Sequence, residues 1–201
     1  MGDQQATWAN TTHDWSKTVD HGHLQLIRDH ASDYAVTGVQ HLVLEILAYA
    51  NDEAESLGRR GRCTVTYYSD GSIAVADNGR GTDTRRNEHG QFVRKPVMAT
   101  KDLRFFDRET AVLPDGCPRR GMSVVAALSI WLEHTNHRVE GAWTQRYEHG
   151  VPVADLIDVP ACTRTGTTVR FRPAPQLVAT EDVDSTAYTN FPWLTVRSTS
   201  G

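Results

Sequence analysis

The sequence has few cysteines, no long apolar run and no large excess of charge of one sign. Its cysteines, Cys63, Cys117 and Cys162, are far apart, so neither a disulfide framework nor a zinc site of closely spaced cysteines is indicated. Mean hydropathy is -0.48, and no segment approaches the roughly 20 apolar residues that a membrane-spanning helix needs. The first residues also lack the basic and apolar regions of a signal peptide. These absences predict a cytoplasmic protein with no membrane partner.

The charge balance argues against a protein that binds nucleic acid non-specifically. The formal net charge is -4 over 201 residues, whereas such proteins are strongly basic. Hydrophobic residues make up 39% and charged residues 23% of the chain, which is typical of a globular domain. The nine histidines form no recognisable metal-binding pattern. We expect His21 and His23 to be a surface pair, and we predict no metal site.

The chain divides into an arm, a central unit and a tail. Residues 1–38 are predicted to be a polar arm that contains a short helix at residues 24–34. Residues 39–175 form the predicted globular unit, and residues 176–201 form a tail. Within the unit, residues 82–120 are irregular, basic and broken by prolines. A loop of this length is usually functional, and we interpret it as a lid-like loop.

Periodicity predicts both helices and strands in the central unit. Apolar residues recur at helical spacing over residues 39–57, just before Gly58, which predicts a helix. Residues 63–77 alternate around a Ser-Asp-Gly turn and predict a β-hairpin. A second, buried helix is predicted over residues 122–134. Further strands are predicted at residues 136–141, 142–150 and 167–173. Together these elements predict an α+β sandwich, a mixed sheet with helices on one face.

Five segments of the sequence together resemble a known family. In order they read HLVLEILAYANDEA, DGSIAVADNGRG, GMSVVAALSIWLE, YEHGVP and TGTTVRFRP, and they cover about residues 40–173. This series is similar to the ATP-binding domain of the DNA gyrase B protein and its topoisomerase IV relative, in the GHKL superfamily. The resemblance implies a two-layer GHKL (Bergerat-type) sandwich with a nucleotide pocket.

The resemblance implies that the adenine end of the pocket is kept. Asp77 matches the family aspartate that accepts the adenine amino group, and Gly81 matches the glycine that lets the base approach. Thr167 matches the threonine that supports this aspartate through water. A carboxylate and a hydroxyl can together read a donor–acceptor edge of a ligand. The alternative is that Asp77 only caps a turn.

Five further residues complete the ligand pocket that the resemblance implies. Glu53 and Arg80 match a pair at the mouth of the pocket, and Arg138 matches an arginine at its outer rim. Asp52 and Met98 are also predicted to line it. The alternative for Arg80 and Arg138 is that both are solvated surface residues.

The metal end of the pocket departs from the family pattern. Glu45 matches the family general base, and it lies on the same polar face of the helix as Tyr49. The family holds Mg²⁺ with an asparagine one turn after the glutamate, and here Tyr49 occupies that position. We therefore expect weak or absent Mg²⁺ binding. The alternatives are that Glu45 is a plain surface glutamate and Tyr49 a packing residue.

The glycine-rich lid also departs from the family pattern. Its middle glycine is replaced by Arg119, and Pro118 precedes it, in a run that begins at Gly116 and ends at Gly121. Proline removes a backbone donor and arginine lacks the freedom of glycine, so phosphate binding should be weaker. Arg119 could still bind an anion directly, and we assign Arg119 and Gly121 to an anion-binding lid. The gyrase arm motif and the transducer domain with its phosphate-binding lysine are also missing, so the chain is not expected to act as a topoisomerase on its own.

These observations leave three functions open for a stand-alone domain of this kind. In the first, the former ATP pocket binds a small organic molecule and transforms it by metal-independent acid–base chemistry, with Glu45 and Tyr49 as the catalytic pair. Cyclisation or isomerisation in a biosynthetic pathway would be examples. In the second, the protein is a weak binder of ATP or ADP or a slow ATPase. In the third, it regulates gyrase or binds gyrase-directed antibiotics. We expect a monomer or a homodimer.

Overall fold

The computed structural model describes most of the chain, namely residues 19–82, 85–86, 92–93, 96–106, 111–139, 141–160, 162–177 and 185–201. Residues 1–18 of the predicted arm therefore lie outside the described residues. The helix predicted at residues 24–34 is present as two helices, α2 (His21–Asp29) and α3 (Ala31–Tyr34). No helix in these ranges is long and apolar enough to cross a membrane.

An eight-stranded sheet forms one layer of the fold. Its central path runs in the order β10 (Leu194–Ser200), β1 (Gly61–Tyr67), β2 (Ile73–Asp77), β9 (Gly166–Pro173), β5 (Ser129–Arg138), β6 (Gly141–Glu148) and β7 (Val151–Pro152), while β8 (Ile157–Asp158) also pairs with β6. The β1–β10 pair is parallel and the other pairs in this sheet are antiparallel. The sheet is therefore mixed, as predicted.

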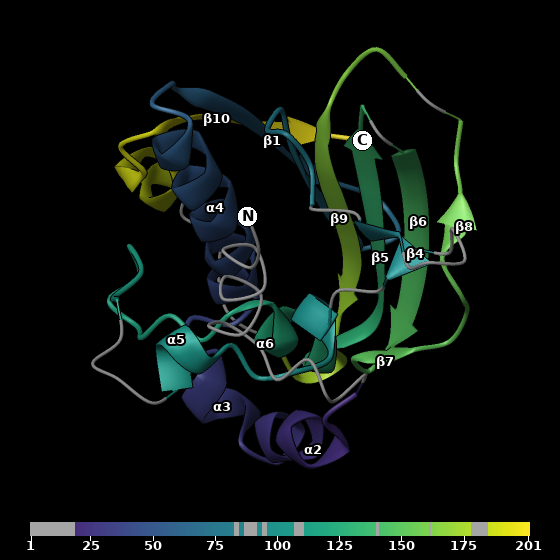
Figure 1. Ribbon diagram of the computed structural model, residues 1–201. Helices are drawn as coiled ribbons and strands as arrows, with labels where there is room; N and C mark the ends of the chain where they lie inside the picture. The colour runs from purple at the N-terminus through teal and green to yellow at the C-terminus, as the bar shows by residue number, and fades with distance from the viewer. Residues whose placement is uncertain are drawn as a thin grey trace, which may run out of the picture.

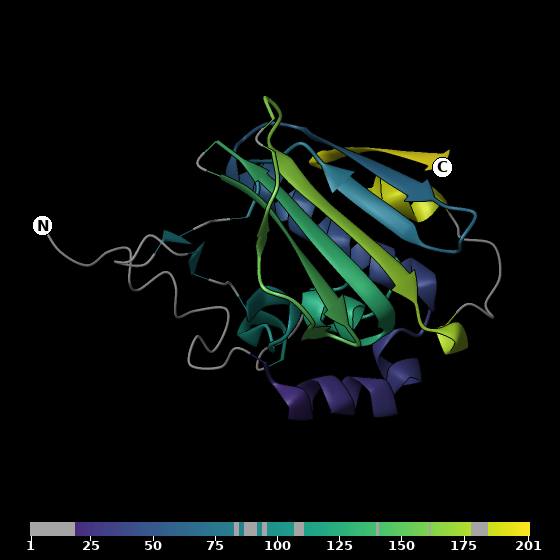
Figure 2. The ribbon, with the colours of Figure 1, turned by 90° about the vertical axis from the view of Figure 1, so that its right-hand side faces the viewer.

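Helices form the second layer and lie on one face of this sheet (Figures 1 and 2). The longest is α4 (Val39–Ser56), which confirms the helix predicted at residues 39–57. Beside it lie α6 (Met122–Ala127) and α5 (Leu103–Phe106). The short elements are β3 (Arg85–Arg86), β4 (Phe92–Val93) and the 3₁₀ helices η1 (Pro96–Met98), η2 (Pro175–Leu177) and η3 (Ser185–Asn190). This arrangement confirms the predicted two-layer α+β sandwich.

The core lies between α4 and the sheet. Every residue from position 41 to position 48 of α4 is buried, so this half of the helix is enclosed on all sides. On the sheet, Val65, Val75 and Phe171 point into the same cluster. The predicted hairpin is confirmed: β1 and β2 pair in antiparallel register, and Gly71 in the turn has a positive φ of 76°.

The second helix is much shorter than predicted. It ends at Ala127, and β5 begins at Ser129, so the prediction of a helix to residue 134 is wrong. The Ser129 hydroxyl donates to the carbonyl of Val125 at 2.6 Å at the helix end. Beyond it, burial mostly alternates along β5, because inward side chains such as Leu132 face the core while their neighbours face outward. The uniform apolar run concealed this change from a helix to a strand.

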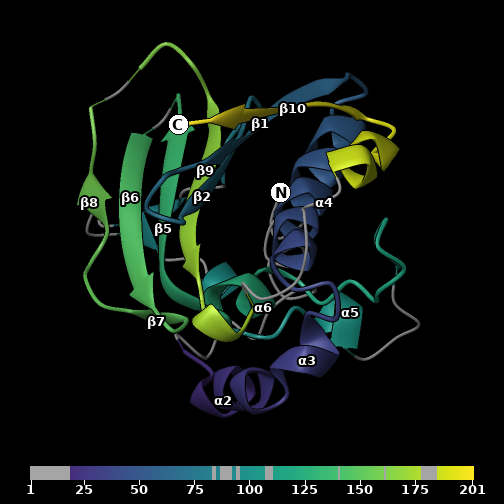
Figure 3. The ribbon, with the colours of Figure 1, turned by 180° about the vertical axis from the view of Figure 1, so that it is seen from behind.

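The structure also shows where the predicted tail and His23 lie. The predicted tail contains β10, which lies beside β1 at the sheet edge (Figure 3) and forms part of the main sheet. His23 was expected at the surface, but it is only 8% exposed and its Nε2 lies 2.8 Å from the Ser123 hydroxyl. Burial lowers the pKa of His23 to about 4. The prediction of a surface pair is therefore wrong for His23, which joins α2 to α6.

Candidate functional site

Asp77 and Thr167 lie together where β2 ends beside β9. Asp77 Oδ1 accepts a hydrogen bond from the backbone N–H of Gly79 at 2.7 Å, and Thr167 donates to the same carboxyl from its backbone and its side chain. Burial raises the pKa of Asp77, and these hydrogen bonds oppose the rise. The close approach depends on Gly166, where a Cβ atom would lie 2.1 Å from the Asp77 carbonyl oxygen. Asp77 therefore caps a turn, and it also directly contacts the predicted partner threonine.

One ion pair and one arginine–carbonyl contact lie next to Asp77. Arg80 donates to both carboxylate oxygens of Glu53, at 2.6 and 3.0 Å, and thereby lowers the pKa of Glu53. Arg138 Nη1 donates to the carbonyl of Gly81 at 3.1 Å. Gly81 has φ of 83°, and a Cβ there would lie 2.6 Å from Asn136 Oδ1, so only glycine fits. The structure thus brings the predicted rim residues together, because the Arg138 charge also lowers the pKa of Glu53, while Arg80 stays exposed at the surface.

A small hollow lies beside Asp77. It is lined partly by Ala50, Ala54, Asn78 and Leu194, and its volume is about 10 Å³. That is room for about one water molecule. A heterocyclic ligand at Asp77 would therefore bind elsewhere around the carboxyl group or displace neighbouring side chains.

Glu45 lies at the other end of the site and is fully buried. Its carboxylate accepts hydrogen bonds from the backbone N–H groups of Arg120 and Gly121, the second at 2.9 Å. Its exposed fraction is 0%, so the alternative of a surface glutamate is wrong. His41 Nε2, one turn earlier, lies 3.5 Å from Glu45 Oε1. Burial alone would lower the pKa of His41, but the carboxyl groups of Asp115 and Glu45 raise it to about 9.

The hydroxyl group of Tyr49 is held by Asp102. The phenol donates to Asp102 Oδ2 at 2.7 Å, and Arg104 binds the same oxygen at 2.8 Å. Burial raises the pKa of Tyr49 well above its usual value, with a further rise from the Asp102 charge. Asp102 directly precedes α5, within the stretch that the sequence predicted to be irregular. Glu45 and Tyr49 are thus both engaged by protein partners.

Arg119 fills the space next to Tyr49. Its guanidinium carbon lies 4.7 Å from the centre of the Tyr49 ring and 4.5 Å from that of Phe105, so the cation makes cation–π contacts with both rings. Its Nη2 lies 2.8 Å from Asp52 Oδ2. The residue is only 6% exposed, and its Nε has no hydrogen-bond partner among the described residues. Arg119, Tyr49 and Asp52 therefore form one packed cluster.

This cluster does not fit a magnesium triphosphate. Mg²⁺ requires six oxygen ligands in near-octahedral geometry. At the position of the family ligand, Tyr49 offers one phenol oxygen, and its proton is already donated to Asp102. The Arg119 guanidinium packs against the same ring, where its charge would repel a metal ion. The two backbone N–H groups bound by Glu45 are also unavailable to phosphate.

Met98 is the predicted pocket residue that the structure does not connect to these contacts. It ends η1 and is 3% exposed within the core cluster, and η1 packs against α6. Its predicted role in ligand binding stays a prediction. Conversely, the sequence prediction missed Phe105 and Asp102, because their contacts with Arg119 and Tyr49 depend on the path of a segment without clear periodicity.

Comparison with known proteins finds relatives of one kind, the B proteins of DNA gyrase and topoisomerase 4. The DNA gyrase B protein of Thermotoga maritima is 35% identical over 152 residues, which cover 73% of this chain and 23% of that protein. The DNA gyrase B protein of Mycolicibacterium smegmatis is 36% identical over 146 residues, 72% of this chain and 21% of that protein. The DNA topoisomerase 4 B protein of Staphylococcus epidermidis is 33% identical over 142 residues, 70% of this chain and 21% of that protein. No protein-family model matches the sequence.

A solved structure extends this likeness to the fold. The topoisomerase IV ATP-binding domain of Francisella tularensis, in complex with a small-molecule inhibitor, superimposes with a TM-score of 0.66 at 25% identity. The match covers 88% of this chain and 89% of that one. The fold is therefore that of a GHKL-like ATP-binding domain. Within this class, the chain is a homologue of the B proteins of DNA gyrase and topoisomerase IV, and it spans between a fifth and a quarter of the length of these relatives.

Proposed function

We propose that this domain binds a small organic molecule at the Asp77 end of the former nucleotide pocket and does not use ATP with Mg²⁺. One observation carries the proposal. Arg119, stacked on Tyr49 and paired with Asp52, occupies the region where the resemblance would place metal and phosphates. At the other end, the carboxyl group of Asp77 keeps its threonine partner. The domain would thus retain the base-reading end and lose the metal end.

The chemistry of Asp77 and Thr167 indicates the class of ligand. An ionised carboxylate accepts hydrogen bonds, and a threonine hydroxyl both donates and accepts. The pair therefore suits a flat ring that carries an amino group next to a ring nitrogen, as adenine does. The Francisella relative, which holds a small-molecule inhibitor, supports the idea that this fold accepts ligands other than nucleotides.

Transformation of the ligand would require the site to open. Glu45 could act as a base only after it releases the N–H groups of Arg120 and Gly121, and Tyr49 only after it releases Asp102. While both residues keep these partners they take no part in catalysis, and the proposed role is ligand binding after side chains beside Asp77 have moved. Acid–base chemistry such as isomerisation or cyclisation would require a conformation in which the segment before α6 has moved away from α4.

Ligand-induced thermal stabilisation tests the proposal. It is measured with adenine, adenosine, ADP and ATP, each with and without Mg²⁺. Adenine or adenosine at a hundred times Kd should stabilise the fold by about 2.7 kcal/mol. We expect this effect to be independent of Mg²⁺ and no larger with the triphosphate. Asp77→Asn should abolish it, whereas Asp33→Asn, at an exposed carboxylate of α3, should leave it unchanged.

The same experiment distinguishes the alternatives. If ATP binds at least ten times more tightly than adenosine, and only with Mg²⁺, the domain is a nucleotide-binding protein and our proposal is wrong. If a gyrase-directed inhibitor binds through Asp77 while adenine and adenosine do not, the ligand class is wrong but the site is right.

A further inference from the structure

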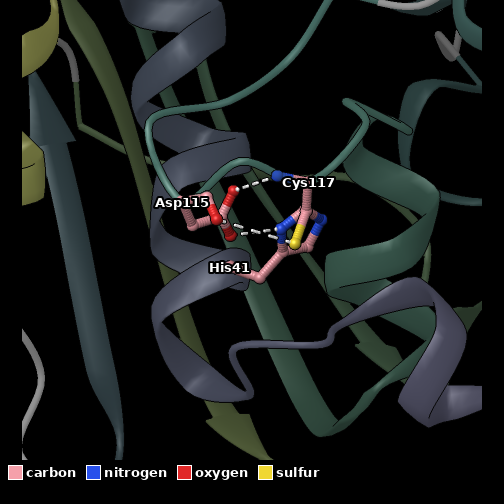
Figure 4. Close-up of side chains that lie close together, drawn as sticks. All are labelled: His41, Asp115 and Cys117. Carbon is pink, nitrogen blue, oxygen red and sulfur yellow. Dashed lines mark hydrogen bonds and ion pairs between the residues drawn. The ribbon is translucent and has the colours of Figure 1, made fainter.

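Three side chains with metal-binding atoms meet between α4 and the segment that leads to α6. They are His41, in the first turn of α4, and Asp115 and Cys117, which stand two residues apart in the loop (Figure 4). One ligand atom from each lies within 4.8 Å of the others. We propose that His41, Asp115 and Cys117 bind a divalent transition metal of the zinc class.

The donor set favours this class of metal. A thiolate, an imidazole nitrogen and a carboxylate oxygen are the three ligand types that zinc uses in proteins, and hard ions such as Mg²⁺ and Ca²⁺ avoid thiolate. Three protein ligands leave a fourth tetrahedral position for water or a ligand. Coordination to such a metal would deprotonate the Cys117 thiol.

The surroundings already hold two of the ligands in place. His41 Nδ1 lies 2.7 Å from Asp115 Oδ2, which also accepts from the Thr37 hydroxyl at 2.8 Å. Asp115 Oδ1 accepts from the backbone N–H of Cys117 at 3.0 Å. A metal inserted between Nδ1, Oδ2 and the sulfur would need these atoms to separate only slightly, because ligand atoms around zinc lie about 2.0–2.3 Å from the ion.

An independent observation points to the same site. His41 is 0% exposed, and its Nε2 has no hydrogen-bond partner among the described residues. A histidine that ligates through Nδ1 carries its proton on Nε2, where it needs an acceptor. Glu45 Oε1, 3.5 Å from Nε2, is in position to accept that proton after a small shift. Metal binding would therefore complete the carboxylate–histidine–metal arrangement that orients histidine ligands in known sites.

The consequence for the fold is a clamp. The metal would tie the loop around Gly116 to the start of α4. One of its ligands, Cys117, lies two residues before Arg119, which contacts the rings of Tyr49 and Phe105. Sequence spacing could not reveal the site, because His41 and Asp115 are 74 residues apart. The metal site and the proposed ligand site can be tested separately, because the hydrogen bonds of His41 and Asp115 run to residues other than Asp77.

Cobalt spectroscopy on the full chain tests the proposal directly. The reduced protein is stripped with a chelator and titrated with Co²⁺, which takes zinc sites and gives a thiolate-to-metal charge-transfer band. We expect the band to saturate at one equivalent and to disappear when Zn²⁺ is added. Cys117→Ser should abolish the band, and Thr37→Val, which removes only the hydrogen bond to Asp115, should weaken metal affinity at least tenfold while the band persists.

Cys162→Ser is the matched control, because exposed Cys162 lies 3.5 Å from His137 Nδ1 and could bind metal at the surface. A band that survives Cys117→Ser and disappears in Cys162→Ser overturns the proposal, as does the absence of any band in the folded wild-type chain. Circular dichroism of each variant establishes that the fold is intact. If Cys117→Ser does not fold, Asp115→Asn serves instead, with at least a tenfold loss of affinity expected.

Discussion

The carboxylate of Glu45 is predicted to hold the segment before α6 against α4. Glu45→Gln keeps the shape of the side chain but replaces one acceptor oxygen with an amide N–H₂ group. Because both oxygens of Glu45 accept from backbone N–H groups, the amide must place a donor against a donor. No water can relieve this conflict easily, because the side chain is 0% exposed.

The expected loss of stability follows from these contacts. A hydrogen bond to a charged group contributes about 1.5–3 kcal/mol, and a buried N–H left without a partner costs about 1–3 kcal/mol. Partial relaxation will reduce the sum, so we expect Glu45→Gln to lower the free energy of unfolding by about 3–4 kcal/mol. For a chain of this size, that corresponds to a fall in Tm of roughly 6–16 °C.

Urea denaturation and hydrogen exchange measure this effect. The exposed Glu55, on the same helix, gives the control variant Glu55→Gln, for which a change within about 0.5 kcal/mol is expected. In Glu45→Gln the amides of Arg120 and Gly121 should also exchange faster than in the wild type. A loss below about 1 kcal/mol with unchanged exchange of both amides would refute the view that this carboxylate holds the segment.

Three further predictions follow from other contacts. In urea denaturation, Gly166→Ala should destabilise the fold by more than about 3 kcal/mol, because its Cβ would lie 2.1 Å from a backbone carbonyl oxygen. Gly116 also has a positive φ but lies in open space, so Gly116→Ala should lose only about 1 kcal/mol. Equal losses in the two variants would contradict this prediction. Because the pKa of His23 is lowered to about 4 from 6.5, its contribution is complete above pH 6.5 and disappears as the pH falls toward 4. His23→Gln should therefore flatten the stability–pH curve by about 3 kcal/mol over this window, and an unchanged curve would contradict the assigned burial. Finally, Tyr49→Asn combined with Arg119→Gly restores the family residues, and calorimetry should detect at least tenfold tighter, Mg²⁺-dependent binding of ATP; no gain would show that the cluster is not what excludes the metal.

The sequence predicted the elements whose periodicity is strong. The helix at residues 39–57 and the hairpin at residues 63–77 carry clear 3.6-residue and two-residue patterns, and both are confirmed. The end of α6 could not be predicted in the same way. Apolar residues continue from Met122 through Leu132 with little interruption, so a buried helix and a buried strand look alike in this stretch.

The site was predicted less completely than the fold. Resemblance identified Asp77 and Thr167, which the structure places in contact. It could not show that Arg119 folds back onto Tyr49, because a stacked arginine leaves no spacing signal in the chain. The burial of Glu45 was missed for a related reason: its hydrogen-bond partners are backbone groups, which every sequence possesses.

The backbone N–H groups of Arg120 and Gly121 already bind an anion, the carboxylate of Glu45. That anion is attached to a rigid helix, so its local concentration exceeds the millimolar values that short flexible tethers produce. A soluble anion at micromolar levels cannot compete for these donors by its charge alone. Any molecule that does displace Glu45 must gain most of its affinity from other contacts, so its shape will decide whether it binds.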